Sequence, residues 1–386
     1  MYLGGLAQGM ALVTFPALSG VLTNPTLYGL STSQYGTLFV PLVVLAILGA
    51  ALGPGIARRS GLKWVFVAGL GLNLVAMAVL ILSQGVLGQR DIAYETLLLA
   101  TAALGAGFGT TLMALNAYVA ALFPTQTDVA LPALHAFLGT GTTLAPLLAA
   151  IVMRASWWIL PAGVGAALLG LAVASLWQPL RTAAAGASAG RAAIPRKTAG
   201  RLGIYAGTVL LYGICETLFG NWAPLYLHDD AQISAYWADI ALAAFWAMVT
   251  AGRIATAATS LWIGARRIYL ALPFLILIAF LGIPRLSGVA PNVMAFGFAG
   301  IACSAFLPLS ISFAEEEFSQ GAATVSGSLV AAYMVGYGIG AFGVGPVQDI
   351  GHLALSTVYT GASVLAAGTA VLAFVLARPR SARARG

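Results

Sequence analysis

Charged residues are scarce in this chain: Asp, Glu, Lys and Arg make up 8% of its 386 residues, against 60% hydrophobic residues. Soluble domains carry about 25% charged residues, so this chain has too little charge to cover a water-exposed surface. Its apolar runs reach the length of about 20 residues that crosses the hydrocarbon core of a bilayer. The scarcity of charge excludes a soluble protein and predicts an integral membrane protein.

Cysteine and histidine are also scarce, with two and three residues. Cys215 and Cys303 fall inside apolar runs, so we expect buried free thiols and not a disulfide. The histidines and cysteines stand far apart and show no metal-ligand spacing, which predicts no metal site. The chain has no phosphate-binding Gly-Lys-Ser/Thr motif and no Gly-x-Ser-x-Gly nucleophile motif. We therefore expect no ATP as energy source, no cofactor and no enzymatic activity.

The apolar runs predict an all-α integral membrane fold with twelve transmembrane helices. Their expected ranges are 2–21, 34–56, 64–84, 94–122, 131–153, 157–178, 202–227, 236–258, 268–284, 291–312, 323–346 and 353–377. The 46 glycines suit membrane helices that approach one another closely and slide.

Lysine and arginine collect in alternate connections between these spans. Of the 18 cations, only Arg90, Arg154 and Arg285 fall on one side, and the others fall on the opposite side. Cytoplasmic loops are enriched in Lys and Arg, so we expect both termini in the cytoplasm and the protein in the inner membrane. This distribution accounts for the net charge of +7, and we expect a monomer without a nucleic-acid partner.

A basic, Ala/Gly-rich stretch at 179–201 lacks a hydrophobic period and predicts a flexible linker. It divides the chain into six-helix bundles at 1–178 and 202–386. Pro146 and Pro346 follow glycine-bearing runs in the fifth and eleventh spans, which favours two pseudo-symmetric halves repeated in parallel. Glycine, proline and basic loops also occur in other polytopic proteins. The linker, together with the comparable basic loops after the second span (53–64) and in the eighth-span region (252–267), nevertheless favours the repeat.

The loop after the second span, GPGIARRSGLKW, resembles the major facilitator signature Gly-x-Leu-Ala-Asp-Arg-x-Gly-Arg-Arg. The matching positions are Ile56, Ala57, Arg59, Gly61 and Lys63. The resemblance implies the major facilitator fold and secondary transport. It also implies a cytoplasmic gate that includes Arg59, Gly61 and Lys63, with Arg253 in the comparable basic stretch after the eighth span. Arg58 replaces the usual acid, which argues against a gate in which that acid caps a helix of the other half.

Four longer segments, 24–50, 211–227, 244–253 and 323–349, resemble the fucose:proton symporter family of glucose, galactose and fucose carriers. The resemblance implies proton-coupled transport of a sugar-like solute. The fucose carriers place acids in the first and fourth spans, but this chain has only Gln8 as a strong polar group in its first span. A fucose site with two carboxylates is therefore not expected.

Glu216 is the one acid that falls in the middle of a predicted span. A charged carboxylate there costs about 3 kcal/mol or more, and burial favours its protonated form. No Lys or Arg is predicted at the same depth, which favours a site that binds and releases a proton. We therefore interpret Glu216 as the proton-coupling or solute-binding acid. The structural alternative is a neutral glutamic acid that hydrogen-bonds a neighbouring helix.

Polar and aromatic residues in six spans could line a central solute site with Glu216. A sugar-like solute needs amides and hydroxyls for its hydroxyl groups and an aromatic face against its ring. Each such residue can also serve in helix packing, but together they match what a central cavity requires. The candidates are Gln8, Asn116, His135, Tyr212, Asn221, Trp222, Trp246, Tyr333 and Tyr337.

These observations favour a secondary transporter that binds a small polar organic solute between two rocking halves and moves it together with protons. One alternative is a proton-driven exporter of amphipathic or drug-like compounds, although the fifth span reads LAPLLAA where such antiporters have Gly-Pro-x-x-Gly-Gly. The other alternative is a membrane sensor that does not transport.

Overall fold

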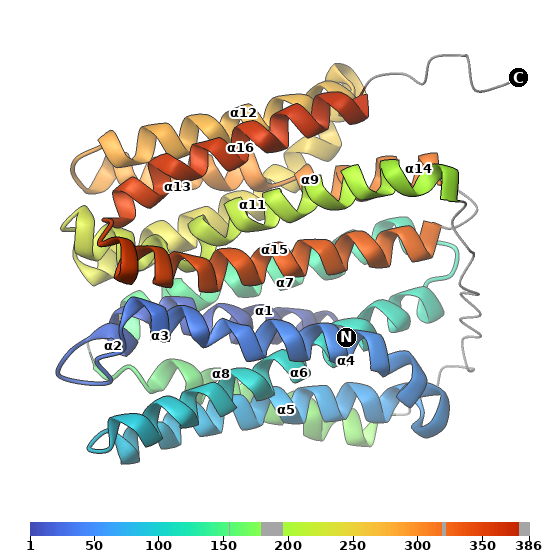
Figure 1. Cartoon of the computed structure of the whole chain (residues 1–386). Helices are drawn as coiled ribbons and strands as arrows, with labels where there is room; N and C mark the ends of the chain where they lie inside the picture. Colours follow the sequence, from blue (N-terminus) through green and yellow to red (C-terminus); the bar gives the residue numbers. More distant parts are fainter. Residues whose placement is uncertain (154, 179–195, 319–321, 378–386) are drawn as a thin grey trace, which may run out of the picture.

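The computed structural model describes residues 1–153, 155–178, 196–318 and 322–377 (Figure 1). Regular structure within these residues is all helical. Twelve segments are long and apolar enough to cross a membrane, and each overlaps its predicted range, so the predicted spans are confirmed. The segments are Tyr2–Thr23, Thr32–Ser60, Leu62–Val86, Arg90–Leu122, Val129–Val152, Ile159–Trp177, Gly200–Asn221, Ala235–Ile263, Ala265–Arg285, Val289–Glu317, Thr324–Gly351 and Leu355–Ala377.

We refer to the elements from α1 to α8 as the N-terminal half and to those from α9 to α16 as the C-terminal half. The N-terminal helices are α1 (Tyr2–Ala17), α2 (Ser19–Thr23), α3 (Thr32–Thr37), α4 (Phe39–Ser60), α5 (Leu62–Leu82), α6 (Arg90–Leu122), α7 (Thr127–Val152) and α8 (Ile159–Trp177). The C-terminal elements are α9 (Arg196–Asn221), α10 (Ala223–Leu225), the π-helical turn η2 (Tyr226–Asp230), α11 (Ala235–Ile263), α12 (Ala265–Gly282), α13 (Val289–Cys303), α14 (Phe306–Glu317), α15 (Ala322–Gly351) and α16 (Leu355–Ala377).

The predicted linker is only partly described. Residues 179–195 lie outside the described residues, and Arg196 already begins α9, so the last part of the predicted linker is helical. Figure 1 shows the blue-to-green helices of the N-terminal half beneath the yellow-green-to-red helices of the C-terminal half, with the N-terminus and the red end of α16 toward the same end. We call this the terminal end of the bundle, and the opposite end, where the α2–α3 connection lies, the far end.

Within each half, the first span packs against the fifth, α1 against α7 and α9 against α15. Glycine allows this close approach, because a side chain on Gly141 of α7 would collide with the main-chain oxygen of Leu6. A side chain on Gly336 of α15 would collide in the same way with the main-chain oxygen of Leu210. The glycine-bearing runs in the fifth and eleventh spans therefore have one structural cause, which is backbone contact between membrane helices.

The second and third spans of each half are joined by a single glycine. Gly61 connects α4 to α5 with φ of 91°, and Gly264 connects α11 to α12 with φ of 85°. Residues with a Cβ rarely adopt positive φ, so both sharp connections require glycine. The two comparable loops in the sequence thus form the same kind of joint, and they lie at the terminal end of both halves.

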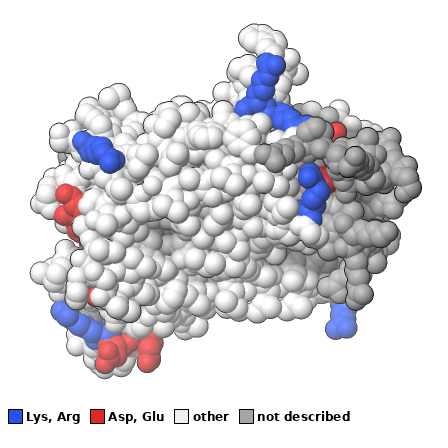
Figure 2. Space-filling model, turned by 45° about the horizontal axis from the view of Figure 1, so that its top comes forward, with Lys and Arg blue, Asp and Glu red and all other residues white. Residues whose placement is uncertain are grey.

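Charged side chains lie toward the two ends of the molecule. On the face shown in Figure 2, a broad central band carries no Lys, Arg, Asp or Glu. This band is what a bilayer requires of a lipid-facing surface. Among described residues, the joints at the terminal end are flanked by Arg58, Arg59, Lys63, Arg266 and Arg267. The connections at the far end are flanked by Arg90 and Arg285.

Candidate functional site

Glu216 lies five residues before the end of α9 and is buried, with 4% of its surface exposed. Both carboxylate oxygens are bound by tyrosine hydroxyls. Tyr212 of α9 lies 2.7 Å from Oε1, and Tyr333 of α15 lies 2.5 Å from Oε2. Tyr212 precedes Glu216 by one helical turn, as the spacing in the sequence predicts, whereas Tyr333 comes from the fifth span of the same half. The acid is therefore held by side chains and not by neighbouring backbone.

The hydroxyl of Tyr212 also lies 2.6 Å from the main-chain oxygen of Cys303. A tyrosine hydroxyl has one hydrogen to donate, and a carbonyl oxygen can only accept. If Tyr212 donates to Cys303, its contact with Glu216 is completed by a proton on Glu216 Oε1. Tyr333 then donates to Oε2, and every hydrogen is used once. The geometry therefore accommodates a protonated Glu216 with a full set of hydrogen bonds.

A break in the tenth span supplies the carbonyl groups around this acid. Helix α13 ends at Cys303 and α14 begins at Phe306, so carbonyls at the break lose their helical partners. The Cys303 oxygen faces Tyr212, and the Ser304 oxygen accepts a hydrogen bond of 3.0 Å from Arg253 Nε. Interrupted helices of this kind are tolerated in membranes where protein covers the exposed backbone.

Arg253 of α11 is the cation of this cluster. Its guanidinium lies within electrostatic range of both Glu216 and His135 of α7. The sequence predicts Arg253 at a cytoplasmic gate and no cation at the depth of Glu216. Arg253 already lies inside the predicted span 236–258, and in the structure it lies well inside α11 and binds the break in the tenth span. The seven-residue spacing from Trp246 to Arg253 could have placed both on one helix face. Glu216 thus has stabilising partners for its ionised form as well as its neutral form.

Asn221 and Trp222 end α9 beside the junction of the two halves. The Asn221 Oδ1 accepts a hydrogen bond of 3.2 Å from Tyr337, and its main-chain oxygen accepts one from Tyr35 of the N-terminal half. The fully buried Trp222 donates to the main-chain oxygen of Gly340 at 3.1 Å and packs edge-on against Tyr35. Trp222 and Tyr337 are therefore already partnered, whereas Asn221 retains a free amide group.

Three of the predicted solute-binding residues each carry a buried polar atom without a hydrogen-bond partner among the described residues. They are Asn116 Oδ1 of α6, Asn221 Nδ2 of α9 and Trp246 Nε1 of α11. The Trp246 ring reaches α9, where a Cβ on Gly220 would lie 2.8 Å from its Cζ2 atom. Buried polar atoms are satisfied in most native structures. One acceptor and two donors therefore remain for groups that are not part of the chain.

Gln8 of α1 is paired inside the N-terminal half. It is fully buried and exchanges two hydrogen bonds with Asn73 of α5, at 3.3 and 2.8 Å. Asn73 also reaches Thr111 of α6 at 3.3 Å and the main-chain oxygen of Gly69. Because its amide is already paired, we leave Gln8 out of the proposed solute site.

The residues predicted for the cytoplasmic gate lie in separate places. Arg59 is exposed at the end of α4, and Gly61 forms the adjacent joint. Lys63 donates hydrogen bonds to the main-chain oxygens of Leu176 and Gln178, at 2.8 and 2.9 Å, so it caps the end of α8 within the same half. Among the described residues, the hydrogen bonds that join the two halves, Ser33 to Asp349 and Tyr35 to Asn221, lie away from the terminal end.

The far end is where the two halves are joined. Asp349 Oδ2 of α15 accepts a hydrogen bond of 2.9 Å from the main-chain nitrogen of Ser33 in α3. Gly345 lies against the backbone of Ser33. Gly36 lies so close to α15 that a Cβ added to it would be 2.9 Å from the main-chain oxygen of Ala341. The described conformation is therefore closed between α3 and α15.

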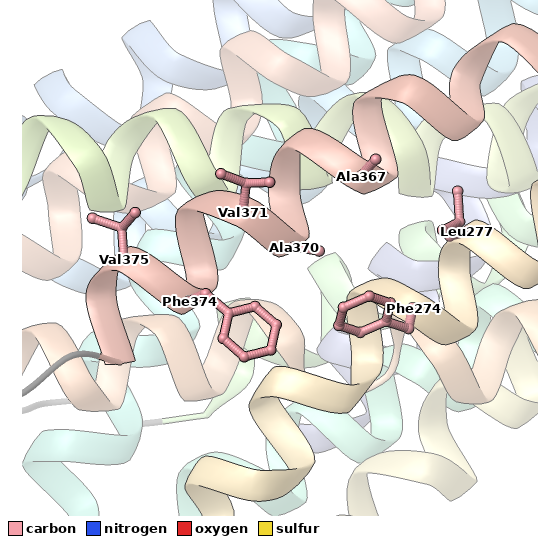
Figure 3. A pocket seen from close by; sticks show the side chains of 7 residues that line it. All are labelled: Phe274, Leu277, Ala367, Ala370, Val371, Phe374 and Val375. Atoms are coloured by element: carbon pink, nitrogen blue, oxygen red, sulfur yellow. The ribbon is translucent and has the colours of Figure 1, made fainter.

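A groove between α12 and α16 has different chemistry. Its lining, shown in Figure 3, consists of apolar side chains only: Phe274, Leu277, Ala367, Ala370, Val371, Phe374 and Val375. It offers no polar group to orient a solute, and its composition suits lipid chains. Among the described residues no group of three His, Cys, Asp or Glu side chains is placed to hold a metal ion.

Comparison with known proteins identifies the architecture. The family profile of the Major Facilitator Superfamily matches residues 2–341. A crystal structure of a D-xylose-proton symporter aligns with a TM-score of 0.75 at 17% identity, covering 98% of this chain and 95% of the other. The nucleoside transporter NupG aligns with a TM-score of 0.72 at 16% identity, covering 97% and 96%. At these identities the similarity shows the fold. No curated protein sequence matches the chain.

Proposed function

The chain belongs to the Major Facilitator Superfamily and is a multi-pass transporter and not an enzyme, and we propose that it is a proton-coupled symporter of a small, sugar-like solute. One observation carries the proposal. The buried carboxyl of Glu216 has hydrogen-bond partners that suit its protonated form and a nearby guanidinium that suits its ionised form. A group that must take up and release a proton during transport needs both states.

The unpaired polar atoms support a solute with several hydroxyl groups. Asn116 offers an acceptor, and Asn221 and Trp246 each offer a donor. Hydroxyl groups both donate and accept, and the indole of Trp246 can lie against a sugar ring. The resemblance of four segments to the fucose:proton symporter family points to the same solute class. The two aligned structures, named a D-xylose-proton symporter and a nucleoside transporter, are also of proteins named for sugars or sugar-bearing solutes.

The excess of Lys and Arg at the terminal end supports a cytoplasmic location for both termini. With that orientation, the junction of α3 and α15 closes the outer side in the described conformation. Solute and proton would enter when this junction separates and leave after it forms again, as alternating access requires.

The proposal is tested with the purified protein in proteoliposomes and the variant Glu216→Gln. Glutamine keeps the size of the side chain and can donate to Tyr212 as a protonated acid does, but it cannot release a proton. Wild type should accumulate a radiolabelled aldopentose, aldohexose or nucleoside when a proton gradient is imposed, and the variant should not. Exchange of labelled for unlabelled solute at equal pH should persist in the variant, because exchange needs no net proton transfer.

The matched control is Asp91→Asn, which removes an exposed acid from the first turn of α6 at the far end. It should accumulate solute as wild type does. Wild-type accumulation by Glu216→Gln would contradict the proposed coupling role of this acid.

The aromatic surroundings of a single acid favour one second candidate, which is a proton-driven exporter of amphipathic compounds. The aromatic side chains of this half that lie in or against the buried core include Trp222, Trp246, Tyr333 and Tyr337. The direction of transport separates the two functions. Right-side-out vesicles that accumulate sugars under an inward proton gradient support symport, whereas vesicles that only extrude amphipathic cations under the same gradient support export.

A further inference from the structure

The apolar groove between α12 and α16 lies open on the surface of the C-terminal half. Figure 3 shows the rings of Phe274 and Phe374 next to each other at the groove, and their centroids are 5.9 Å apart. The side chains of Phe274, Val371 and Phe374 are 42%, 62% and 46% exposed. On a membrane-spanning helix pair, such a surface is covered by the apolar chains of lipids.

The groove lies within one leaflet of the bilayer. Helix α12 begins at Ala265 and α16 ends at Ala377, both at the terminal end. At a rise of 1.5 Å per residue, Leu277 lies about 18 Å from that end of α12, and Ala367 lies about 15 Å from that end of α16. Half of the hydrocarbon core is about 15 Å thick. The lining residues therefore cover the acyl-chain level of the leaflet at the terminal end.

Two arginines lie in line with the groove on α12. Seven residues make almost two turns of an α-helix and eleven make about three. Arg267 therefore shares a helix stripe with Phe274, and Arg266 shares the neighbouring stripe with Leu277. Buried residues of α12 such as Ile276 lie on the opposite face. Both arginines belong to the first turn, about 10 Å or more from the groove along the helix axis, which is the level of the lipid headgroups.

The positive charge at this place is not neutralised by the described residues. Arg266 and Arg267 are exposed, and neither forms an ion pair or a hydrogen bond with a described residue. Glu315 and Glu316 end α14 on the same side of the molecule, but no ion pair joins them to these arginines. Helices α12 and α16 contain no Asp or Glu, and the positive end of the α12 dipole adds to the attraction for an anion.

We propose that this groove binds an anionic phospholipid, with the phosphate at Arg266 and Arg267 and one acyl chain between α12 and α16. Guanidinium groups bind phosphate oxygens through paired hydrogen bonds, and the chain covers the exposed rings. In the proposed orientation the terminal end faces the cytoplasm, and the cytoplasmic leaflet is the one that carries negative surface charge. The bound lipid holds the ninth and twelfth spans together. The site does not depend on the proposed symport.

Native mass spectrometry of the purified full chain tests the site. The protein in mild detergent is given equal amounts of phosphatidylglycerol and phosphatidylcholine with identical acyl chains, and the lipid that remains bound is counted. Wild type should retain phosphatidylglycerol about tenfold better, because each basic residue near the headgroup adds to the attraction. The double variant Arg266→Gln with Arg267→Gln should retain both lipids equally. Equal retention of the two lipids by wild type would overturn the proposal.

Two further variants separate the groove from the general charge of the terminal end. Val371→Trp fills the groove from an exposed position and should reduce the retention of both lipids. The matched control, Arg58→Gln with Arg59→Gln, removes the same charge from the end of α4 and should keep the preference of wild type. Melting temperatures show that each variant is folded.

A preference that survives the loss of Arg266 and Arg267, or that the α4 control loses to the same extent, would also overturn the site. Because the measurement needs no solute, its outcome is distinct from that of the transport assays.

Discussion

In the N-terminal half, the buried amide of Gln8 is paired with Asn73, and Asn73 in turn is bound by Gly69 and Thr111. In the C-terminal half, the buried carboxyl of Glu216 contacts the hydroxyls of Tyr212 and Tyr333. Tyr212 also contacts the Cys303 carbonyl at the helix break, and Arg253 donates to the Ser304 carbonyl of the same break. Both clusters involve the first span of their half. The first cluster is neutral and has its amide groups paired, so it stabilises one arrangement. The second contains a carboxyl, which can exist in two protonation states, and the unpaired donors Asn221 Nδ2 and Trp246 Nε1 belong to the same half.

The halves thus share a framework and differ in their buried polar chemistry. Glycine contacts between first and fifth spans and the joints at Gly61 and Gly264 occur in both halves. Described buried acids occur only in the C-terminal half, at Glu216 and Asp239. We infer that the C-terminal half carries the proton chemistry and that the N-terminal half serves as the surface against which it moves.

The largest effect is expected where the shared framework is broken. Gly336→Val and Gly141→Val should each reduce stability by about 3 kcal/mol or more, the upper range for overpacking, because a side chain would collide with main-chain atoms of the neighbouring helix. Yield and melting temperature in detergent measure this. Gly343→Val on α15 is the control, because a Cβ there meets no atom within 4 Å. Equal melting temperatures for Gly336→Val and Gly343→Val would contradict the inferred backbone contact.

A smaller effect is expected from Gln8→Leu, which sharpens the contrast between the two polar clusters. The substitution leaves the Asn73 amide short of partners, and an unsatisfied buried group costs about 1–3 kcal/mol. The melting temperature should fall, while solute accumulation should persist, since no proton is carried there. Loss of accumulation at an unchanged melting temperature would show that Gln8 binds solute or takes part in coupling after all.

The smallest effect is expected at the contact that joins the halves. Asp349→Ala removes a partly solvated hydrogen bond to the Ser33 nitrogen, worth about 1 kcal/mol, and should shift the population toward the conformation opened at the far end. Labelling of single cysteines near α3 by an impermeant thiol reagent measures this, and several-fold faster labelling is expected. Asp349→Asn keeps an acceptor oxygen and should label more slowly than Asp349→Ala. Identical rates for wild type and Asp349→Ala would argue against this contact as a closure.

Hydropathy and charge were sufficient to predict the twelve spans, because a segment that crosses lipid must satisfy its own backbone and be apolar over its whole length. The pairing of Tyr212 with Glu216 also follows from helical spacing. The role of Tyr333 could not be derived in this way, because its contact with Glu216 depends on which helices pack side by side. The predicted gate at Arg59, Gly61 and Lys63 remains a prediction, although Lys63 binds the end of α8.

The amino-acid sequence by itself determined the membrane location, the helical class and the rarity of buried charge, because these depend on local composition and on the high cost of polar groups in hydrocarbon. Only the tertiary structure decided which polar groups meet. The break at Ser304 directs two carbonyls toward Tyr212 and Arg253, and the packing of α15 on α9 brings Tyr333 to Glu216. Such contacts join residues far apart in the chain, and no local pattern encodes them.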